Sequence, residues 1–293
     1  MKKNQFIVLN EVQVEEIRKL AKETRQSLSI GEMPIANDIF TLLEQLNIKL
    51  LEYPIQSEGD KPAFSAAMMY SEENGEELVF IGLNTADYFD KQIFAIAHEL
   101  FHYYTKTGSH LSRLSEEDDS LVEVKANRFA AEFLFSEVAL KSIIIDEFKA
   151  SKIEKVSEKA ILRFIVRLQC TWWLPYRSIV KRLFEIGAIS EGQYGKLYGI
   201  NERNLDDEYG RMGLAFNEEV FKKLNSRTNS IGTSMKDIDI IVRNFEDGLI
   251  SEDKLADTLS LFEKSPDDFG YGISVSDEDE FDDFFSRGDF DEG

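Results

Sequence analysis

Two histidines in the segment FAIAHELFHYY, residues 94–104, constrain the fold more than any other feature of this sequence. They are His98 and His102, in a chain of 293 residues that contains only 3 histidines. Residues four positions apart lie on the same face of an α-helix. The other side of the same segment is apolar and contains Ile93, Ile96, Ala97, Leu100 and Tyr104. The sequence therefore predicts a helix over about 90–105, with one face in the core and both imidazoles on another.

Glu99 follows the first histidine and completes the pattern H-E-x-x-H. In zinc metalloproteases this pattern lies on a helix, where the two histidines bind the metal and the glutamate acts as general base. The alternative is a pair of core histidines satisfied by hydrogen bonds, but a chain with so few histidines rarely forms the pattern by accident. Since a catalytic zinc ion usually has three protein ligands and a water molecule, a third ligand should lie elsewhere in the chain.

Two stretches offer a third ligand. The polar loop 107–120 contains His110 and four consecutive acidic residues, 116–119, but such a run most often forms a solvated surface. The helix predicted over 120–135 contains Glu123, and the neighbours on its side of the helix are Ala126, Asn127, Ala130 and Leu134. A second stripe of that helix is predicted to be exposed, with an ion pair at i and i+4, and consists of Lys125, Arg128 and Glu132.

Glu123 is the better candidate of the two. An unpaired carboxylate on an alanine-rich inward face costs several kcal/mol, and a metal ion beneath that face would remove the cost. The alternative is that Glu123 lies near a frayed, exposed start of its helix. The predicted zinc ligands are therefore His98, His102 and Glu123, with water in the fourth position and Glu99 as general base. This helix–loop–helix order is that of the Glu-type zincins, or gluzincins.

The remaining segments predict a small sheet followed by helices only. Strand-like segments are 48–53, 63–70 and 77–84, and the dipeptide Asn74-Gly75 between the last two is a hairpin signal. Helices are predicted over 11–28, 34–47, 152–168, 175–187, 235–247 and 252–263, with a short one after Ser190 and a polar linker at 200–215. This order predicts an α+β fold. It has a zincin-like core with a small N-terminal antiparallel sheet and active-site helices, then an all-helical C-terminal region and a disordered acidic tail.

We expect four parts along the chain: a zincin-like metallopeptidase core in 1–136, a helical module in 137–200, a C-terminal helical region in 201–264 and a tail in 265–293. The tail has 11 acidic residues and one basic residue, Arg287. Acidic runs of this kind usually stay disordered. Since its phenylalanines exceed what a solubility tail needs, the tail is a candidate for docking on a basic protein surface.

Composition excludes several classes of function. The formal net charge of −21 argues against direct binding to nucleic acid or to an anionic membrane, because phosphate contacts need clustered Lys and Arg. The single cysteine, Cys170, excludes an internal disulfide and a cysteine-rich metal site. The start, MKKNQFIVLN, has too short an apolar run for a signal peptide, and nothing approaches the ~18 apolar residues of a membrane span. We therefore expect a soluble, cytoplasmic protein.

Two segments, IAHELFHYY and EVKANRFAAEFL, resemble the ImmA/IrrE family of metallo-endopeptidases. The resemblance extends upstream to LVFIGLN and downstream to SIVKRLFEIGAIS, over roughly residues 30–200. In that family two histidines and the glutamate three residues before an Ala-Asn pair hold zinc. The resemblance places these roles on His98, His102 and Glu123, and that of the general base on Glu99.

Two departures from the family pattern affect the expected shape of the substrate groove. Neither of them removes a metal ligand. Phe101 stands where the family usually has Gly before the second histidine, and the run from Phe133 to Ser136 replaces a usual Leu-Leu-Met-Pro. Family members typically act in phages, mobile elements or stress regulons by cleaving a repressor. The resemblance thus implies a zinc endopeptidase of narrow specificity that cleaves a partner regulatory protein, such as a helix-turn-helix repressor.

The competing interpretation is a regulator that acts by protein–protein binding, with zinc only stabilising its fold. Hydrolysis with and without Glu99 distinguishes the two. The candidates for stabilising an oxyanion are Tyr88, Tyr103, Tyr104 and His110, and the sequence favours none of them. The strand at 78–84 is a candidate sheet edge for pairing with an extended substrate.

Overall fold

The computed structural model describes residues 8–56, 64–73, 75–107 and 116–272. The chain divides into two compact units, Met1–Ser234 and Met235–Gly293. The predicted boundaries at 136, 200 and 264 stay predictions.

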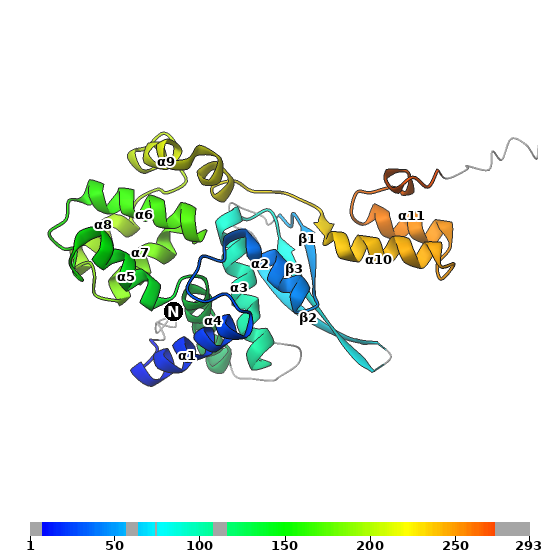
Figure 1. Ribbon diagram of the computed structural model, residues 1–293, viewed down its shortest axis with the longest axis horizontal. Coiled ribbons are helices and arrows are strands. Elements are labelled where there is room, and N and C mark those ends of the chain that lie inside the picture. The colour runs from blue at the N-terminus through cyan, green and yellow to red at the C-terminus, as the bar shows by residue number, and fades with distance from the viewer. Residues whose placement is uncertain (1–7, 57–63, 74, 108–115, 273–293) are drawn as a thin grey trace, which may run out of the picture. The chain divides into compact units, whose positions relative to one another are not determined.

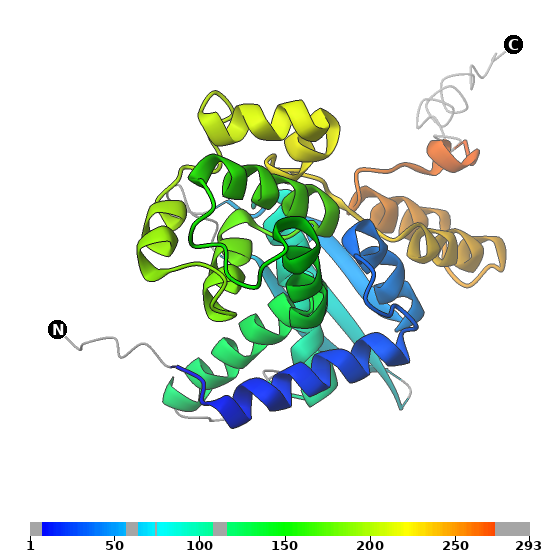
Figure 2. The same ribbon diagram turned by 60° about the vertical axis from the view of Figure 1, so that its left-hand side comes forward.

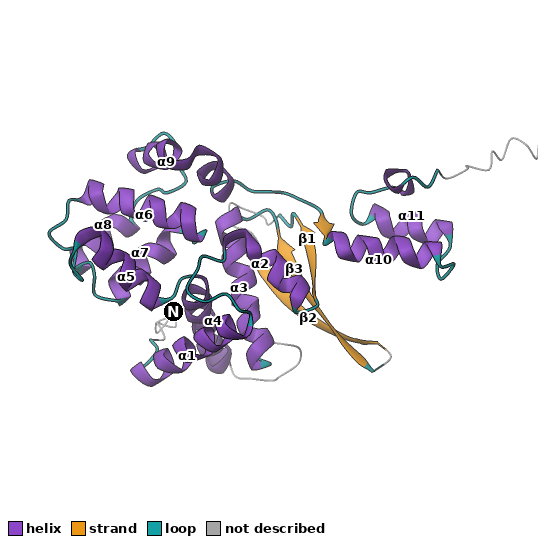
Figure 3. Ribbon diagram, in the orientation of Figure 1, coloured by secondary structure: helices purple, strands orange, loops and turns teal. Residues whose placement is uncertain are grey.

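The first unit contains one sheet with the strand order β2-β3-β1-β4. Its strands are β1 (Ile48–Tyr53), β2 (Ala66–Glu73), β3 (Glu76–Asn84) and β4 (Gly232–Thr233) (Figure 3). β2 and β3 form an antiparallel hairpin with Glu73 opposite Glu76, at the predicted turn. β1 pairs parallel with β3 and antiparallel with β4. The α+β class is confirmed, but the sheet is mixed because β1 and β3 run in the same direction.

The position of each strand decides which one is free to pair with a ligand. β3 lies between β2 and β1, so the prediction that strand 78–84 is a sheet edge is wrong. Within the described strands, β2 is the edge next to β3. The fourth strand, β4, has only two residues and carries no sequence signal of its own.

The helices of the first unit lie beside this sheet (Figures 1 and 2). They are α1 (Glu11–Ser27), η1 (Ala36–Asp38), α2 (Ile39–Gln45), α3 (Phe89–Thr105), α4 (Glu116–Leu134), α5 (Glu137–Phe148), α6 (Glu158–Trp172), α7 (Tyr176–Glu185), α8 (Glu191–Tyr198) and α9 (Glu208–Leu224). α3 packs against β2, β3 and α4, and α4 in turn packs against α1. α3 is thus held between the sheet and α4.

The buried faces of α3 and α4 follow the helical repeat. The predicted core face of α3 is confirmed, since the residues with 0% exposure include Ile93, Ile96, Ala97 and Leu100. On α4 the residues with 0% exposure include Ala126, Phe129, Ala130 and Phe133. Burying this apolar surface stabilises the pair by about 25 cal/mol per Å². Because the two helices pack tightly against each other, the side chains on their other faces are held in fixed positions.

The predicted linker at 200–215 is wrong, because α9 begins at Glu208 and packs on α6. Tyr209 is 1% exposed, and its hydroxyl donates to Gln169 Oε1 at 2.7 Å. Two glycines interrupt the apolar repeat of this segment, and both lie where the chain packs closely. A Cβ on Gly210 would lie 2.4 Å from the Asn204 carbonyl oxygen, and one on Gly213 would lie 2.3 Å from the Phe221 ring. A short polar stretch with glycines can therefore be buried structure.

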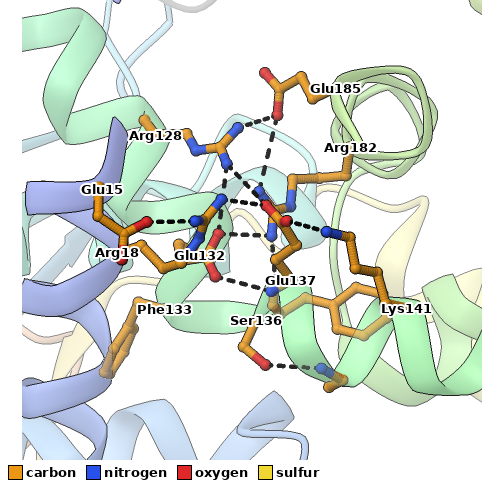
Figure 4. Close-up of polar contacts among 12 residues, drawn as sticks. Glu15, Arg18, Arg128, Glu132, Phe133, Ser136, Glu137, Lys141, Arg182 and Glu185 are labelled. Atoms are coloured by element: carbon orange, nitrogen blue, oxygen red, sulfur yellow. Dashed lines mark hydrogen bonds and ion pairs between the residues drawn. The ribbon is translucent and has the colours of Figure 1, made fainter. Parts of the chain in front are cut away.

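The predicted exposed stripe on α4 is also wrong. The Glu132 side chain is 3% exposed and that of Arg128 is 10% exposed. Both belong to a cluster of charged side chains between α1, α4, α5 and α7, where Arg182 lies 2.7 Å from Glu132 (Figure 4). The residues look like a solvated stripe in the sequence because each is charged, but their partners come from distant segments.

The second unit contains α10 (Met235–Glu246), α11 (Glu252–Ser260) and η2 (Pro266–Phe269), and the two helices match the predicted segments. Its apolar contacts include Ile238, Leu255 and Leu259, each at most 1% exposed. Tyr271 packs on Phe245 with ring centroids 5.3 Å apart. The structure thus places η2 and Tyr271 within the segment 265–272. Residues 273–293 lie outside the described part of the chain.

Within the described part of the chain, no helix combines the length and apolarity needed to cross a membrane.

Candidate metal centre

α3 and α4 bring together the three residues predicted to bind metal. His98, His102 and Glu123 each offer a ligand atom, and these atoms lie within 4.8 Å of one another. The Nε2 atoms of His98 and His102 are 3.2 Å apart. Oε2 of Glu123 lies 3.1 Å from Nε2 of His98, and Oε1 lies 3.5 Å from Nε2 of His102. Three donor atoms of the types that zinc prefers thus face one point.

These distances fit a tetrahedral metal ion. With metal–nitrogen bonds of about 2.0–2.1 Å at tetrahedral angles, two histidine nitrogens lie about 3.3 Å apart. The separation of 3.2 Å between the two Nε2 atoms is close to that value. Two histidines and one carboxylate also leave one position open, which is the pattern of catalytic zinc sites.

The other ring nitrogen of each histidine has an acceptor. Nδ1 of His98 lies 3.2 Å from Oδ1 of Asn127, and Nδ1 of His102 lies 3.0 Å from the Thr107 carbonyl oxygen. A carbonyl acceptor places the proton on Nδ1 and leaves the Nε2 lone pair free for a metal. Both imidazoles are therefore held in the tautomer that binds metal through Nε2. The signal in the sequence for this role of Asn127 is its position four residues after Glu123, which places it on the same helix face.

Glu99 lies beside this cluster on α3 and is 8% exposed. Burial raises the pKa of its carboxyl group, and the nearby Glu123 raises that pKa further, whereas His98 and a hydrogen bond from the Met68 backbone N–H lower it. The hydrogen bond from Met68 ties the carboxylate to the edge strand β2. Glu99 is thus fixed between the metal ligands and the sheet.

Glu123 reaches the cluster from a more open position than predicted. Its side chain is 55% exposed, so it faces a pocket and does not lie beneath a buried alanine face. Without metal, the hydrogen bond that its carboxylate accepts from Nε2 of His98 lowers the pKa of this carboxyl group, and burial has the opposite effect. The predicted neighbours Ala126 and Ala130 are buried, as expected, but they pack against the core. The structure places Glu123 beside the two histidines, but its exposure contradicts the argument from a buried alanine-rich face.

A pocket of about 620 Å³ surrounds the cluster. Its walls come from the edge strand β2, from α3, from α4 and from the start of α7. The β2 residues are Ala66, Ala67 and Met68, and the α7 side supplies Arg177 and Ser178 after Pro175. The three clustered side chains therefore lie in a pocket beside the edge strand β2.

The other candidates from the sequence lie elsewhere or outside the described residues. Tyr88, Tyr103 and Tyr104 are not among the residues that line this pocket. Tyr88 instead stacks under the guanidinium of Arg203, whose central carbon is 4.1 Å from the ring centre. His110 lies outside the described residues, as do the side chains of the acidic run 116–119. No oxyanion-stabilising residue is therefore assigned.

Comparison with known proteins gives one match. Residues 43–162 match the family model of the IrrE N-terminal-like domain, Peptidase_M78. This confirms the resemblance to ImmA/IrrE proteins for the segment that holds β1 to β3, α3, α4 and the clustered His98, His102 and Glu123. No curated protein and no solved structure matches the chain.

Proposed function

Because residues 43–162 form an IrrE N-terminal-like domain of a peptidase family, we propose that this protein is a zinc-dependent endopeptidase of narrow specificity. The observation that carries the proposal is the arrangement at one pocket. His98, His102 and Glu123 converge there with an open fourth position, and the carboxylate of Glu99 lies beside them.

The chemistry follows from the residues that surround the open position. His98, His102 and Glu123 would hold the zinc ion. When bound, zinc lowers the pKa of a coordinated water and polarises a peptide carbonyl. Glu99 can accept the proton of the attacking water and pass it to the leaving amine, as a general base and then a general acid. Its hydrogen bond from the Met68 N–H keeps the carboxylate oriented for both transfers.

The edge strand β2 is the proposed binding surface for the peptide backbone. Ala66, Ala67 and Met68 line the pocket, and β2 has a free edge within the described sheet. An extended peptide can add to such an edge through backbone hydrogen bonds, which place one of its peptide bonds above the metal centre. The small side chains of Ala66 and Ala67 leave room for that approach. The proposed substrate is a partner regulatory protein, such as a helix-turn-helix repressor, in the cytoplasm.

The proposal is tested with Glu99→Gln, which keeps the size of the side chain and removes the base. We expect zinc content and folding to be retained, and peptide hydrolysis to fall by about a hundredfold or more. Wild type and variant are incubated with candidate partner proteins encoded near the gene, and fragments are identified by mass spectrometry. The matched control is Glu52→Gln, another carboxyl group whose pKa is raised by burial, which is not among the residues lining the metal pocket.

Two outcomes would contradict an endopeptidase that uses Glu99 as its base. Equal fragment yields from wild type and Glu99→Gln would mean that another residue or a contaminant cleaves. Full biological activity of Glu99→Gln, with no fragments from either protein, would favour the regulator that acts by binding alone.

A further inference from the structure

A second pocket, of about 710 Å³, adjoins the metal pocket. Phe94, Asn127 and Ser178 line both of them. The two pockets follow the same two helices: Asn127 on α4 and Ser178 on α7 are shared, and the second pocket continues to Arg128 and Lys181. A ligand that lies across the metal centre can therefore extend into the second pocket without leaving the surface of the molecule.

The second pocket concentrates positive charge in a chain with a net charge of −21. Five cationic side chains line it, and they are Arg18, Arg128, Lys141, Lys181 and Arg182. The carboxylates paired with them in the described residues are those of Glu15, Glu132, Glu137 and Glu185 (Figure 4). Five positive charges against four negative ones leave an excess of one positive charge at this place.

The hydrogen-bond donors of the cluster are also incompletely paired. Arg182 has a side chain that is 1% exposed, and within the described residues its Nε and Nη1 atoms have no hydrogen-bond partner. The Nε atoms of Arg18 and Arg128 lack one as well. Burial lowers the pKa of Arg182, and Glu132 and Glu185 only partly offset that effect. These donor atoms are buried, as is the equally unpartnered Oε2 of Glu132, so an anion in the pocket would act on Arg182 through its charge and not through a hydrogen bond.

The remaining walls of the pocket are apolar and strengthen its electrostatic field. They include Val8, Leu9, Val14, Val124 and Ile186. Apolar walls exclude water and lower the local dielectric constant, so that a charge interacts more strongly there than on an open surface. A bound group with an aliphatic stem and a carboxylate head would match both the walls and the cations.

We propose that this pocket binds an acidic side chain of the peptide substrate and so determines which sequences are cleaved. The proposal rests on the proposed endopeptidase function. Arg128 lies five positions after Glu123 on α4, about 7.5 Å further along the axis and on a different face of the helix. Since an extended peptide advances ~3.3 Å per residue, the acidic residue should lie at least two or three residues from the cleaved bond.

Lys181 allows the pocket to be changed without breaking its buried pairs. Its side chain is 62% exposed, and its ammonium group lies 3.8 Å from the Glu185 carboxylate. Lys181→Glu should therefore reverse the charge at the pocket wall while the protein stays folded and keeps its zinc. The matched control is Lys196→Glu, the same change at an exposed lysine of α8 that is not among the lining residues of either pocket.

The probe is a set of short peptides with acetylated and amidated ends, so that their only carboxylates are on side chains. Each peptide carries one Glu, or its neutral isostere Gln, at a different position. Binding to zinc-loaded Glu99→Gln protein is measured by fluorescence anisotropy, and cleavage by wild type is measured by mass spectrometry. We expect Glu to bind about tenfold more tightly than Gln at one fixed distance from the cleaved bond, because a charge-assisted hydrogen bond is worth roughly that factor. Lys181→Glu should abolish this ratio, and Lys196→Glu should leave it unchanged.

The two readouts separate this proposal from the endopeptidase proposal. Cleavage without any preference for Glu, or a preference that survives in Lys181→Glu, would overturn the acidic pocket and leave the endopeptidase intact. Binding that depends on Glu and on Lys181, with no cleavage of any peptide, would support the pocket and count against the endopeptidase.

Discussion

The two ends of α4 use the same residue type in opposite ways. Two turns after its start, Glu123 has a side chain that is 55% exposed and faces the metal pocket. Near its end, Glu132 has a side chain that is 3% exposed and pairs with Arg182 of α7. The exposed carboxylate is available to a ligand, whereas the buried one is committed to holding helices together. The comparison shows that a glutamate on an amphipathic helix acquires its role from the segments that pack around it.

The buried end also organises the next turn of the chain. Oε1 of Glu132 accepts a hydrogen bond from the Glu137 backbone N–H at 2.8 Å, at the start of α5. Arg182 Nη2 donates to the Phe135 carbonyl oxygen at 3.1 Å. These contacts close the connection between α4 and α5 and tie α7 to it. Among the contacts of the described residues, Glu123 forms no such hydrogen bond to the backbone, so the two glutamates should respond differently to mutation.

The largest expected effect is that of Glu132→Ala. It leaves Arg182 buried without its closest carboxylate, and removing one partner of a buried ion pair typically costs about 3–5 kcal/mol. The free energy of unfolding of the metal-free protein, measured by urea denaturation, should fall by that amount. Glu123→Ala is the matched control at the exposed end of the same helix. It should change the same quantity by less than about 1 kcal/mol, because it removes an exposed carboxylate.

Equal losses of stability in the two variants would contradict the contrast between the ends of α4. A stable Glu132→Ala protein would show that water or neighbouring glutamates compensate Arg182, and that the cluster contributes little to folding.

An intermediate effect is expected for Asn127→Ala. Its Oδ1 atom orients His98 through Nδ1 at 3.2 Å, and loss of such a contact typically weakens metal binding 10–100-fold. The zinc affinity is measured by competition with a chromophoric chelator. Thermal stability of the metal-free protein should barely change. An unaltered zinc affinity would mean that His98 keeps its orientation through packing alone.

The smallest effects are expected in the second unit. Ending the chain after Gly272 should leave hydrogen exchange of α10 and α11 unchanged, because an acidic segment with few aliphatic residues contributes little to a core. Ending it after Lys264 also removes the buried Pro266 and the ring of Tyr271, which packs on Phe245. That variant should lose about 1 kcal/mol of protection in α10. Equal exchange in both variants would show that η2 does not support the helices.

The sequence was most informative where a residue pattern and a function coincide. The periodicity of α3 predicted its buried face, and H-E-x-x-H placed both histidines on one other face. The identification of Glu123 followed from its spacing and the family resemblance. Its exposure could not be predicted, because the pocket that it faces is built by β2 and α7, which are distant in the sequence.

The sequence patterns of charged segments and of segments with glycine predicted the wrong degree of burial. Arg128 and Glu132 form a regular i, i+4 pair that is typical of an exposed stripe. The pair is buried because Arg182 of α7 packs against Glu132. The segment 200–215 lacks an apolar repeat because Gly210 and Gly213 supply close backbone contacts in place of side chains. In both cases the decisive partner lies far away in the chain, where local patterns carry no information about it.

The central claim is that His98, His102 and Glu123 bind one catalytic zinc ion, and metal analysis tests it most directly. Protein purified without affinity metals is dialysed against a weak chelator and analysed by elemental mass spectrometry. We predict about one zinc per chain in wild type, as expected for a single site with three protein ligands. Glu123→Ala should lose most of its zinc, while Glu116→Ala and Glu117→Ala, at acidic residues earlier in the same helix, should retain it. Full zinc content in Glu123→Ala would contradict the account.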